Sequence, residues 1–388
     1  MTRTARATAK GDLTMSIAAD IRAKFEMPEG IYLLNHSVGC LPRAARRALE
    51  DQWFGPWAEK GSDGWGEWIA AVDHFREMVA RLIGAQPDDI CPQTNLSGGL
   101  SKILCALPVR EDRHKIVLCE EDFPTVGFVA AAAAHFGLET EFIPRGDAAT
   151  DPDVWAKHLD GAHVAFITHT FSNRSARLPV AEITKLARER DVYSVVDAVQ
   201  ASGVIPYAVD DLGADFLLGT SVKFLCGGSG AGFLWATKDA AEKCSPVDTG
   251  WFSHENPFEF DIRNYRVAPG ARRFWGGTPS IAPYVVAATG IETLLQSGVE
   301  AIHAHNQSLI DRLHEGLPDG ALASERDRER RGNAVLIHVA DAGEALEKMK
   351  SLSIRMDTRE GCLRLSPHLY NTMEEMDLVL EALGPFLK

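Results

Sequence analysis

The sequence predicts an α/β protein, with a mainly parallel sheet in its middle and a smaller α/β unit at its C-terminal end. Short apolar segments alternate with helical ones between about residues 115 and 236, which is typical of a parallel sheet covered on both faces. Two long helical segments follow, and the remaining residues return to short alternating elements. The 388 residues, of which 45% are hydrophobic, are enough for two cores.

The elements of the sheet can be assigned from the apolar segments. The parallel strands are expected at residues 115–119, 141–144, 163–168, 194–197 and 216–219. Helices are expected between them, among others at 126–136 and 180–189. Residues 232–236 follow a glycine-rich stretch closely enough to return as an antiparallel strand.

The flanking regions are expected to be mostly helical. Residues 42–82 have the apolar spacing of two helices, interrupted at Gly61 and Gly64. Helices are also expected at 281–295 and 298–317. The last segment, 334–388, has the pattern of a strand, a helix, a strand and a helix.

Composition excludes several classes of protein. The net charge of −14 opposes binding to nucleic acid or to an anionic membrane surface. No apolar run approaches the ~20 residues of a membrane helix, and Met1 to Ser16 lack the apolar core of a secretory signal. The cysteines form no CxxC pair and the histidines no HExxH motif, so neither a disulfide framework nor a metal site is expected. We expect a cytoplasmic protein that acts on a small molecule.

Two residues of the predicted sheet can carry chemistry. Lys223 follows a buried strand and has apolar neighbours on both sides. Because burying an ammonium group is costly, such a lysine has a depressed pKa and can form an imine with a carbonyl cofactor. Asp197 ends the preceding strand, so its carboxylate should project at the edge where ligands of open α/β folds bind. It can pair there with a protonated pyridine nitrogen, or merely cap a helix.

The residues around this pair are more specific. Asp197-Ala-Val-Gln-Ala-Ser-Gly is followed by Gly213-Ala-Asp-Phe and by Ser221-Val-Lys-Phe-Leu-Cys-Gly-Gly-Ser-Gly. With this order and spacing, the chain resembles the class V aminotransferase superfamily of pyridoxal 5′-phosphate (PLP) enzymes from Tyr32 onward. The resemblance implies PLP held by Lys223 as a Schiff base. It also implies fold type I, that of aspartate aminotransferase: a large domain with a mainly parallel seven-stranded sheet and a small C-terminal α/β domain.

Domain limits and a partner are expected from the same resemblance. Residues 1–15 are expected to form a flexible tail and 16–45 to pack on the small domain. Residues 46–280 would form the large PLP-binding domain, and 281–388 the long connecting helix and the small domain. Gly276-Gly-Thr278-Pro resembles the segment that reaches the neighbouring subunit's phosphate, which implies a homodimer with a shared active site.

The resemblance assigns roles to further residues. Thr94-Asn-Leu-Ser-Gly-Gly precedes a helix expected at 100–107, whose positive end can hold the cofactor phosphate. Arg364 resembles the arginine that binds the substrate α-carboxylate through two parallel bonds. The expected cofactor-binding residues are Asn95, Leu96, Ser97, Phe123, Thr168, Asn173, Asp197, Gln200, Lys223, Trp251 and Thr278. The expected substrate-binding residues are Asn35, Asn173 and Arg364. Of these, Phe123 is expected to stack on the pyridine ring.

Within the superfamily the chain is most similar to kynureninase-like members. Asp122-Phe-Pro-Thr, Gly250-Trp-Phe-Ser-His-Glu and Arg266-Val-Ala-Pro-Gly carry this resemblance. It implies a lyase or hydrolase that acts on an amino acid at its β or γ carbon. Lys223 would remove the α-proton as general base, opposite a ring paired with Asp197.

Several departures leave the reaction open. The chain has Val222 where kynureninases have a tyrosine, Gln200 where they have a histidine, and Val126 where they have an acidic residue. A class V aminotransferase and an amino-acid epimerase, which begin with the same proton removal, are the alternatives. A cysteine desulfurase is less favoured because Cys362 lies only two residues before Arg364, whereas desulfurases of this kind carry their cysteine well upstream.

Overall fold

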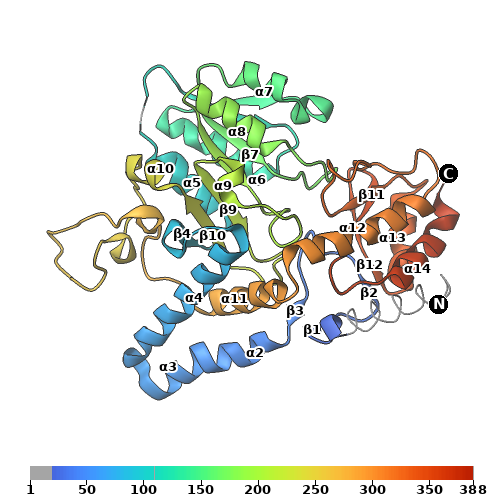
Figure 1. Cartoon of the computed structure of the whole chain (residues 1–388), viewed down its shortest axis with the longest axis horizontal. Coiled ribbons are helices and arrows are strands. Elements are labelled where there is room, and N and C mark those ends of the chain that lie inside the picture. The colour runs from blue at the N-terminus through green and yellow to red at the C-terminus, as the bar shows by residue number, and fades with distance from the viewer. Residues whose placement is uncertain (1–19, 109, 388) are drawn as a thin grey trace, which may run out of the picture.

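The large sheet of the protein has seven strands in the order β4–β10–β9–β8–β7–β5–β6 (Figure 1). The computed structural model describes residues 20–108 and 110–387, so the tail expected at 1–15 lies outside the described residues. The strands are β4 (Ile90–Gln93), β5 (Lys115–Cys119), β6 (Glu139–Ile143), β7 (Ala162–Thr168), β8 (Tyr193–Asp197), β9 (Phe216–Thr220) and β10 (Gly232–Ala236). Only β10 runs against its neighbours. The predicted α/β fold with a mainly parallel sheet is confirmed.

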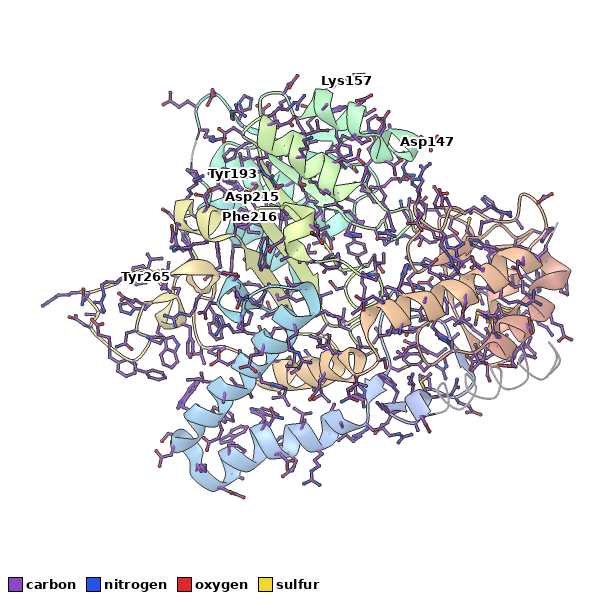
Figure 2. All side chains as sticks on the ribbon, viewed as in Figure 1. Asp147, Lys157, Tyr193, Asp215, Phe216 and Tyr265 are labelled. Carbon is purple, nitrogen blue, oxygen red and sulfur yellow. The ribbon has the colours of Figure 1, made fainter. Side chains whose placement is uncertain are left out.

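The central strands form because they are apolar on both faces. Every residue of β7 and β8 is buried, as expected for strands covered on two sides. Asp215 joins the start of β9 to β8, because its Oδ2 accepts hydrogen bonds from the Ser194 N–H at 2.8 Å and the Ser194 hydroxyl at 2.9 Å (Figure 2). The predicted strands agree with the structure to within two residues at each end.

No strand was expected at β4, which completes the set of seven. This edge strand contains Pro92, which cannot donate a ladder hydrogen bond and is therefore an unfavourable signal for a strand. An edge position tolerates proline, and Pro92 lies opposite Phe233 of β10. Tertiary pairing therefore overrides the local signal.

Helices cover both faces of the sheet. One face packs on α5 (Leu96–Ala106), α6 (Pro124–Ala132) and α10 (Lys238–Lys243), and the other on α4 (Trp65–Ile83), α8 (Val180–Glu189) and α11 (Ala282–Leu295). Two further helices, α7 (Pro152–His158) and α9 (Val209–Leu212), lie at the side of the second face. The helix expected at 126–136 is α6 followed by a 3-10 turn, which ends at Gly137 in the left-handed conformation.

The N-terminal region is helical from residue 44 to 83, with one break. Helix α2 (Ala44–Leu49) continues through a π-helical stretch into α3 (Gly55–Lys60). Gly61 has a φ of 56°, a conformation that suits glycine and ends the first helix. Before this helix, β1 (Phe25–Glu26) pairs with β3 (Leu41–Pro42), and β2 (Ile31–Tyr32) pairs with β12 (Ile354–Arg355) of the C-terminal region.

The C-terminal region has its own sheet and core. Helix α12 (Val299–Gly316) leads to a three-stranded sheet of β11 (Val335–Ile337), β14 (Cys362–Leu365) and β13 (Asp357–Arg359). Helices α13 (Ala342–Ser351) and α14 (Met373–Leu383) pack on it. The single strand expected between these helices was wrong, because Glu360 and Gly361 have φ values of 50° and 80° and fold it into a hairpin.

The domain limits at residues 15, 45 and 280 stay a prediction. Within the described ranges, none of the helices has the length and apolar character needed to cross a bilayer.

The turn after β9 carries Lys223 and is held by close backbone packing. Gly290 of α11 faces this turn so closely that a Cβ atom on it would lie 2.3 Å from the Leu225 carbonyl oxygen. The turn itself contains Cys226 with a φ of 55°, a conformation that non-glycine residues adopt only when their surroundings require it. Helix α11 therefore shapes the backbone on which Lys223 stands.

We predict that Gly290→Ala destabilises the protein although alanine is the better helix former. The clash with a backbone carbonyl should lower the free energy of unfolding by about 1–3 kcal/mol. The matched control is Gly127→Ala in α6, where an added Cβ has no neighbour within 4 Å and should add about 1 kcal/mol of stability. Urea unfolding of both variants measures the difference, and equal stabilisation by both would contradict this account of the turn.

Candidate active site

The carboxyl ends of three neighbouring strands bring the central residues together. Thr168 ends β7, Asp197 ends β8, and the two are directly paired in the sheet. Lys223 follows β9, with its Nζ 5.7 Å from the centre of the Phe123 ring. Because parallel strands end at one edge, residues 168, 197 and 223 meet there despite their separation in the sequence.

Lys223 stands in surroundings that favour the neutral amine. Burial of the amine lowers the pKa of Lys223 to about 8, with the Asp197 carboxylate opposing this shift and Arg364 and Arg359 adding to it. The side chain as a whole keeps some exposure, so the amine can still be reached. Among the described residues no hydrogen bond holds this amine. It is therefore available to react with an aldehyde.

Asp197 is buried next to this amine. Its Oδ1 accepts a hydrogen bond of 2.8 Å from the Val199 N–H. Burial raises the pKa of Asp197 to about 6, although the Val199 bond and the charge of Lys223 lower it. A cation placed against the remaining oxygen would stabilise the ionised form. The nitrogen of a protonated pyridine is such a cation.

A second carboxyl group, Asp122, lies beside Thr168. The Thr168 hydroxyl donates to Asp122 Oδ1 at 2.5 Å, and the Cys119 N–H donates to Oδ2 at 2.8 Å. Burial raises the pKa of Asp122 to about 7, and the nearby charge of Asp197 adds to the shift. Asp122 was not among the residues expected at the site, although it belongs to the motif Asp122-Phe-Pro-Thr. The position of Asp122 directly before Phe123, which is expected to stack on the pyridine ring, was the signal in the sequence that could have identified it.

The expected phosphate site is the start of α5. This helix begins at Leu96, four residues before the position expected, so Leu96 and Ser97 belong to its first turn. The Asn95 side chain caps the helix by accepting from Gly98 N–H and from the Ser97 hydroxyl, both at 2.8 Å. The N–H groups of Leu96 and Ser97 have no partner within the helix and remain for an anion.

Two buried amides, Asn173 and Gln200, were expected near the ring. Asn173 is buried, and its Oδ1 has no hydrogen-bond partner among the described residues. A buried amide oxygen without a partner is costly unless a ligand supplies a donor. Gln200 is also buried, but its Nε2 donates to the His36 carbonyl oxygen at 3.2 Å. Its contact with the ring stays a prediction.

These residues fit PLP. Lys223 offers an unbonded amine for the aldehyde, Asp197 a free carboxylate oxygen for the ring nitrogen, and Asn173 an unpartnered oxygen for a ring substituent. The Phe123 ring is 49% exposed, so one of its faces is open to stack on a heterocycle. The start of α5 can hold the phosphate.

Two of the three predicted substrate residues, Arg364 and Asn35, differ in how exposed and how fully hydrogen-bonded they are. Arg364 forms a bidentate pair with Asp357 through Nε at 2.9 Å and Nη2 at 2.7 Å, and its Nη1 donates to the Ser172 carbonyl oxygen at 2.8 Å. Asn35 is fully buried, donates to the Ser366 carbonyl oxygen and accepts from the Tyr370 hydroxyl. Each end of the Asn35 amide has one partner, which leaves one N–H and one oxygen lone pair, but the side chain is fully buried.

Trp251 and Thr278 lie together but apart from Lys223. The Trp251 ring N–H donates to Thr278 Oγ1 at 3.1 Å. No hydrogen bond, ion pair or aromatic contact within the described chain joins either of them to Lys223 or Asp197. Their expected roles at a phosphate stay predictions.

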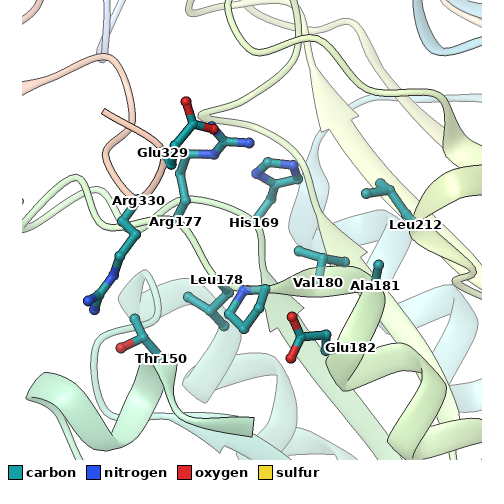
Figure 3. A pocket seen from close by; sticks show the side chains of 11 residues that line it. Thr150, His169, Arg177, Leu178, Val180, Ala181, Glu182, Leu212, Glu329 and Arg330 are labelled. Atoms are coloured by element: carbon teal, nitrogen blue, oxygen red, sulfur yellow. The ribbon is translucent and has the colours of Figure 1, made fainter. Parts of the chain in front are cut away.

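A cavity of about 390 Å³ lies beside the start of α8 (Figure 3). It is lined by His169, Arg177, Glu182 and Glu329, among others. None of the expected site residues lines it, and its two arginines and two glutamates balance in charge. Burial lowers the pKa of His169 to about 3, so this histidine is neutral at ordinary pH. The cavity is therefore separate from the PLP site.

The sheet, Lys223, Asp197 and Phe123 together define a PLP-dependent enzyme of fold type I. Solved structures agree with this fold. A cysteine desulfurase from Thermococcus onnurineus NA1 is 23% identical, with a TM-score of 0.84 over 95% of this chain and 98% of that one. The cystine C-S lyase C-DES is 21% identical, with a TM-score of 0.83 over 92% of this chain and 98% of that one. At these identities the likeness shows the fold alone.

The chain belongs to the family "Aminotransferase class-V", whose model matches residues 31–379, and its cofactor is PLP. An uncharacterized aminotransferase of Bacillus subtilis, YcbU, is 28% identical over 89% of this chain and 91% of its own length. A kynureninase of Deinococcus radiodurans is 30% identical over 77% of this chain and 74% of its own length. The predicted family, fold and cofactor are confirmed.

We predict that PLP uptake by the cofactor-free protein follows the titration of Lys223. Only the neutral amine attacks the aldehyde, so the uptake rate should rise with pH and level off above a midpoint near 8. An ordinary lysine would titrate near 10.5. Rapid mixing with PLP, followed by visible absorbance, measures the rate.

Two variants serve as controls for this experiment. Lys223→Ala should form no visible band, whereas Lys185→Ala on the exposed side of α8 should behave as the unmodified protein. A rate that still rises steeply above pH 9 would show that the amine of Lys223 is not desolvated.

Proposed function

We propose that the protein is a kynureninase-like lyase or hydrolase that cleaves a bond at the β or γ carbon of an amino acid. The observation that carries the proposal is Lys223, a desolvated amine opposite Asp197 and facing Phe123. The kynureninase of Deinococcus radiodurans, 30% identical, supports the choice of reaction. The substrate is then a small amino acid-like molecule rather than a polymer.

Each residue of the site has a part in this reaction. Bound PLP supplies an electron sink for a carbanion. Arg364 orients the substrate through its carboxylate. Lys223, once released by the substrate amine, accepts the proton from Cα and can return it, since its pKa of about 8 is near neutral pH. Asp197 holds the proton on the ring nitrogen, and Phe123 shields one face of the ring from water.

The alternatives are a class V aminotransferase and an amino-acid epimerase. The aminotransferase is favoured by the similarity to the uncharacterized aminotransferase YcbU, which covers 89% of this chain. A cysteine desulfurase is less favoured because Cys362 is buried in β14, where its Sγ lies 3.3 Å from His338 Nδ1. Burial raises the pKa of this thiol, which makes it a weak nucleophile.

We predict that the protein releases alanine from an amino acid such as kynurenine. Mass spectrometry of products from a panel of amino acids, including kynurenine and cysteine, tests this. Lys223→Ala should lower the rate by roughly 10²–10⁴-fold, because it removes the general base. Arg81→Ala, at a helix surface remote from β8 and β9, is the control and should leave the rate unchanged.

Other products would contradict this proposal in distinct ways. A keto acid, with the cofactor converted to its amine form, would identify an aminotransferase. A racemised substrate would identify an epimerase.

We also propose that the protein is a homodimer with a shared active site. A segment between β10 and α11 projects from the large domain (Figure 1), and Tyr265 marks it in Figure 2. It exposes Val247, Phe258, Phe260, Ile262 and Tyr265. Ile262 is 98% and Phe260 77% exposed. Such apolar exposure is typical of a surface that a partner covers. Trp251 and Thr278 lie at the base of this segment, where the partner's phosphate is expected.

We predict that Ile262→Asp together with Phe260→Asp yields a monomer with weakened PLP binding. Buried charges at the interface would be unpaired, and the partner's phosphate contacts would be lost. Size-exclusion chromatography with light scattering measures the mass. The matched control is Leu378→Asp on α14, also an exposed apolar residue, which should leave a dimer. A monomer before substitution would refute the proposal.

The compartment proposed is the cytoplasm. All seven cysteines lie in the described ranges and are free, which is typical of proteins from a reducing compartment.

A further inference from the structure

Arg364 has only part of its hydrogen-bonding capacity in use. A guanidinium group has five N–H donors in one plane. Asp357 takes the Nε–H and one Nη2–H, and the Ser172 carbonyl oxygen takes one Nη1–H. One donor therefore remains on each of Nη1 and Nη2. The edge formed by Nε and Nη2 is closed by Asp357, so a second carboxylate can bind only through the Nη atoms.

Asp357 is itself held in place by two elements. It lies on β13 directly opposite Arg364 of β14, so the hairpin sets the distance between the two side chains. On its other side, His36 Nε2 lies 3.1 Å from Asp357 Oδ2. His36 is buried, and Ser366 Oγ contacts its backbone N–H at 2.8 Å and its Nδ1 at 2.9 Å. The carboxylate of Asp357 therefore lies between a histidine and the arginine to which it is hydrogen-bonded.

The charges in this group are stable at ordinary pH. Burial lowers the pKa of His36, against the effect of Asp357, so the imidazole is neutral. Burial would raise the pKa of Asp357, but His36 and Arg364 outweigh it and hold the pKa well below its usual value. Because Ser366 accepts from the His36 backbone N–H, its hydroxyl proton can go to Nδ1. The imidazole proton then lies on Nε2, which faces Asp357.

We infer that Asp357 is a positioning residue that sets the plane of Arg364, so that its two free Nη donors face the substrate carboxylate in one orientation. This inference rests on the proposed function, in which Arg364 binds that carboxylate. In the proposed function the substrate amine reacts at Lys223, which fixes one group of the substrate. The direction of the carboxylate fixes a second group, and the two together distinguish the two enantiomers of an amino acid. Asp357 thereby contributes to stereoselectivity without touching the substrate.

A competing role for Asp357 makes the opposite prediction. If Asp357 merely occupied Arg364 until a substrate displaced it, its removal would tighten binding of every carboxylate. Removal of its charge also strengthens the attraction of Arg364 for any anion. Both effects act equally on two enantiomers, since these carry the same charges. The ratio of their dissociation constants therefore reports orientation alone.

The experiment measures binding of L-alanine and D-alanine to the PLP-loaded protein by rapid-mixing visible absorbance. We expect the unmodified protein to prefer one enantiomer. In Asp357→Asn this ratio should fall by about tenfold, the effect of losing one well-placed hydrogen bond to a charged group. An unchanged ratio, with or without tighter binding of both enantiomers, would overturn the positioning role.

Two further variants separate this inference from the proposed function. Arg364→Lys should weaken binding of both enantiomers. If it changes neither, the carboxylate role of Arg364 fails, and the positioning role of Asp357 with it. If Arg364→Lys weakens binding but Asp357→Asn keeps the ratio, only the positioning role fails. Asp311→Asn, which breaks an aspartate–arginine pair with Arg331 in the C-terminal region, is the matched control and should keep the ratio.

A second substitution covers the case in which Asp357→Asn does not fold. Asp357→Glu keeps the charge but moves the carboxylate by one methylene group, so the guanidinium plane should tilt. The enantiomer ratio should fall in this variant as well, and an unchanged ratio would again overturn the inference.

Discussion

The burial of Lys223 beside Asp197 is the constraint on which the rest of the site depends. An ammonium and a carboxylate in a dry environment are each costly unless bonded. Here neither bonds the other, and burial moves both pKa values toward neutrality, to about 8 and about 6. The protein thus has two reactive groups that the aldehyde and the ring nitrogen of PLP would satisfy.

That constraint explains why the surrounding backbone is packed so closely. The turn with Lys223 is pressed between α11 and the N-terminal segment, where a Cβ on Gly290 or Gly39 would lie within 2.3 Å of a carbonyl oxygen. The Gly39 N–H also donates to the Val222 carbonyl oxygen at 2.9 Å. Close packing on both sides fixes the backbone of the turn that carries Lys223. A substitution that disturbs this turn should therefore affect both the stability of the fold and the reactivity of the Lys223 amine.

The surroundings of Arg364 are built from segments far apart in the chain. His36 comes from the N-terminal segment, and Asp357 and Arg364 from the C-terminal hairpin. Ser172 follows β7 in the large domain, and its carbonyl oxygen bonds Arg364. Arg364 thus links the two sheets. A change in how these regions meet would alter the direction of its guanidinium group, to which we assign the binding of the substrate carboxylate.

Much of the large domain could be predicted from local sequence. Strands such as β7 and β8 are mostly apolar runs, and Asp197 ends one of them. The sequence therefore predicted both where these strands lie and at which edge of the sheet Asp197 projects. Strand β4 was missed because Pro92 argues against a strand unless its edge position is known. The β13–β14 hairpin was missed because its Glu360–Gly361 turn is a weaker turn signal than Asn-Gly or Asp-Gly.

By itself the sequence determined the family and the cofactor, because the order and spacing of the motifs around Lys223 and Asp197 resemble class V aminotransferases, and this resemblance implies PLP. Tertiary structure decided how these groups are presented. In the folded chain the Asn35 amide has a hydrogen-bond partner at each end, α5 begins at Leu96, and the Asp357 carboxylate pairs with the Arg364 guanidinium group. Residue type sets which bonds a side chain can make, but only the packed chain decides which of them are already used.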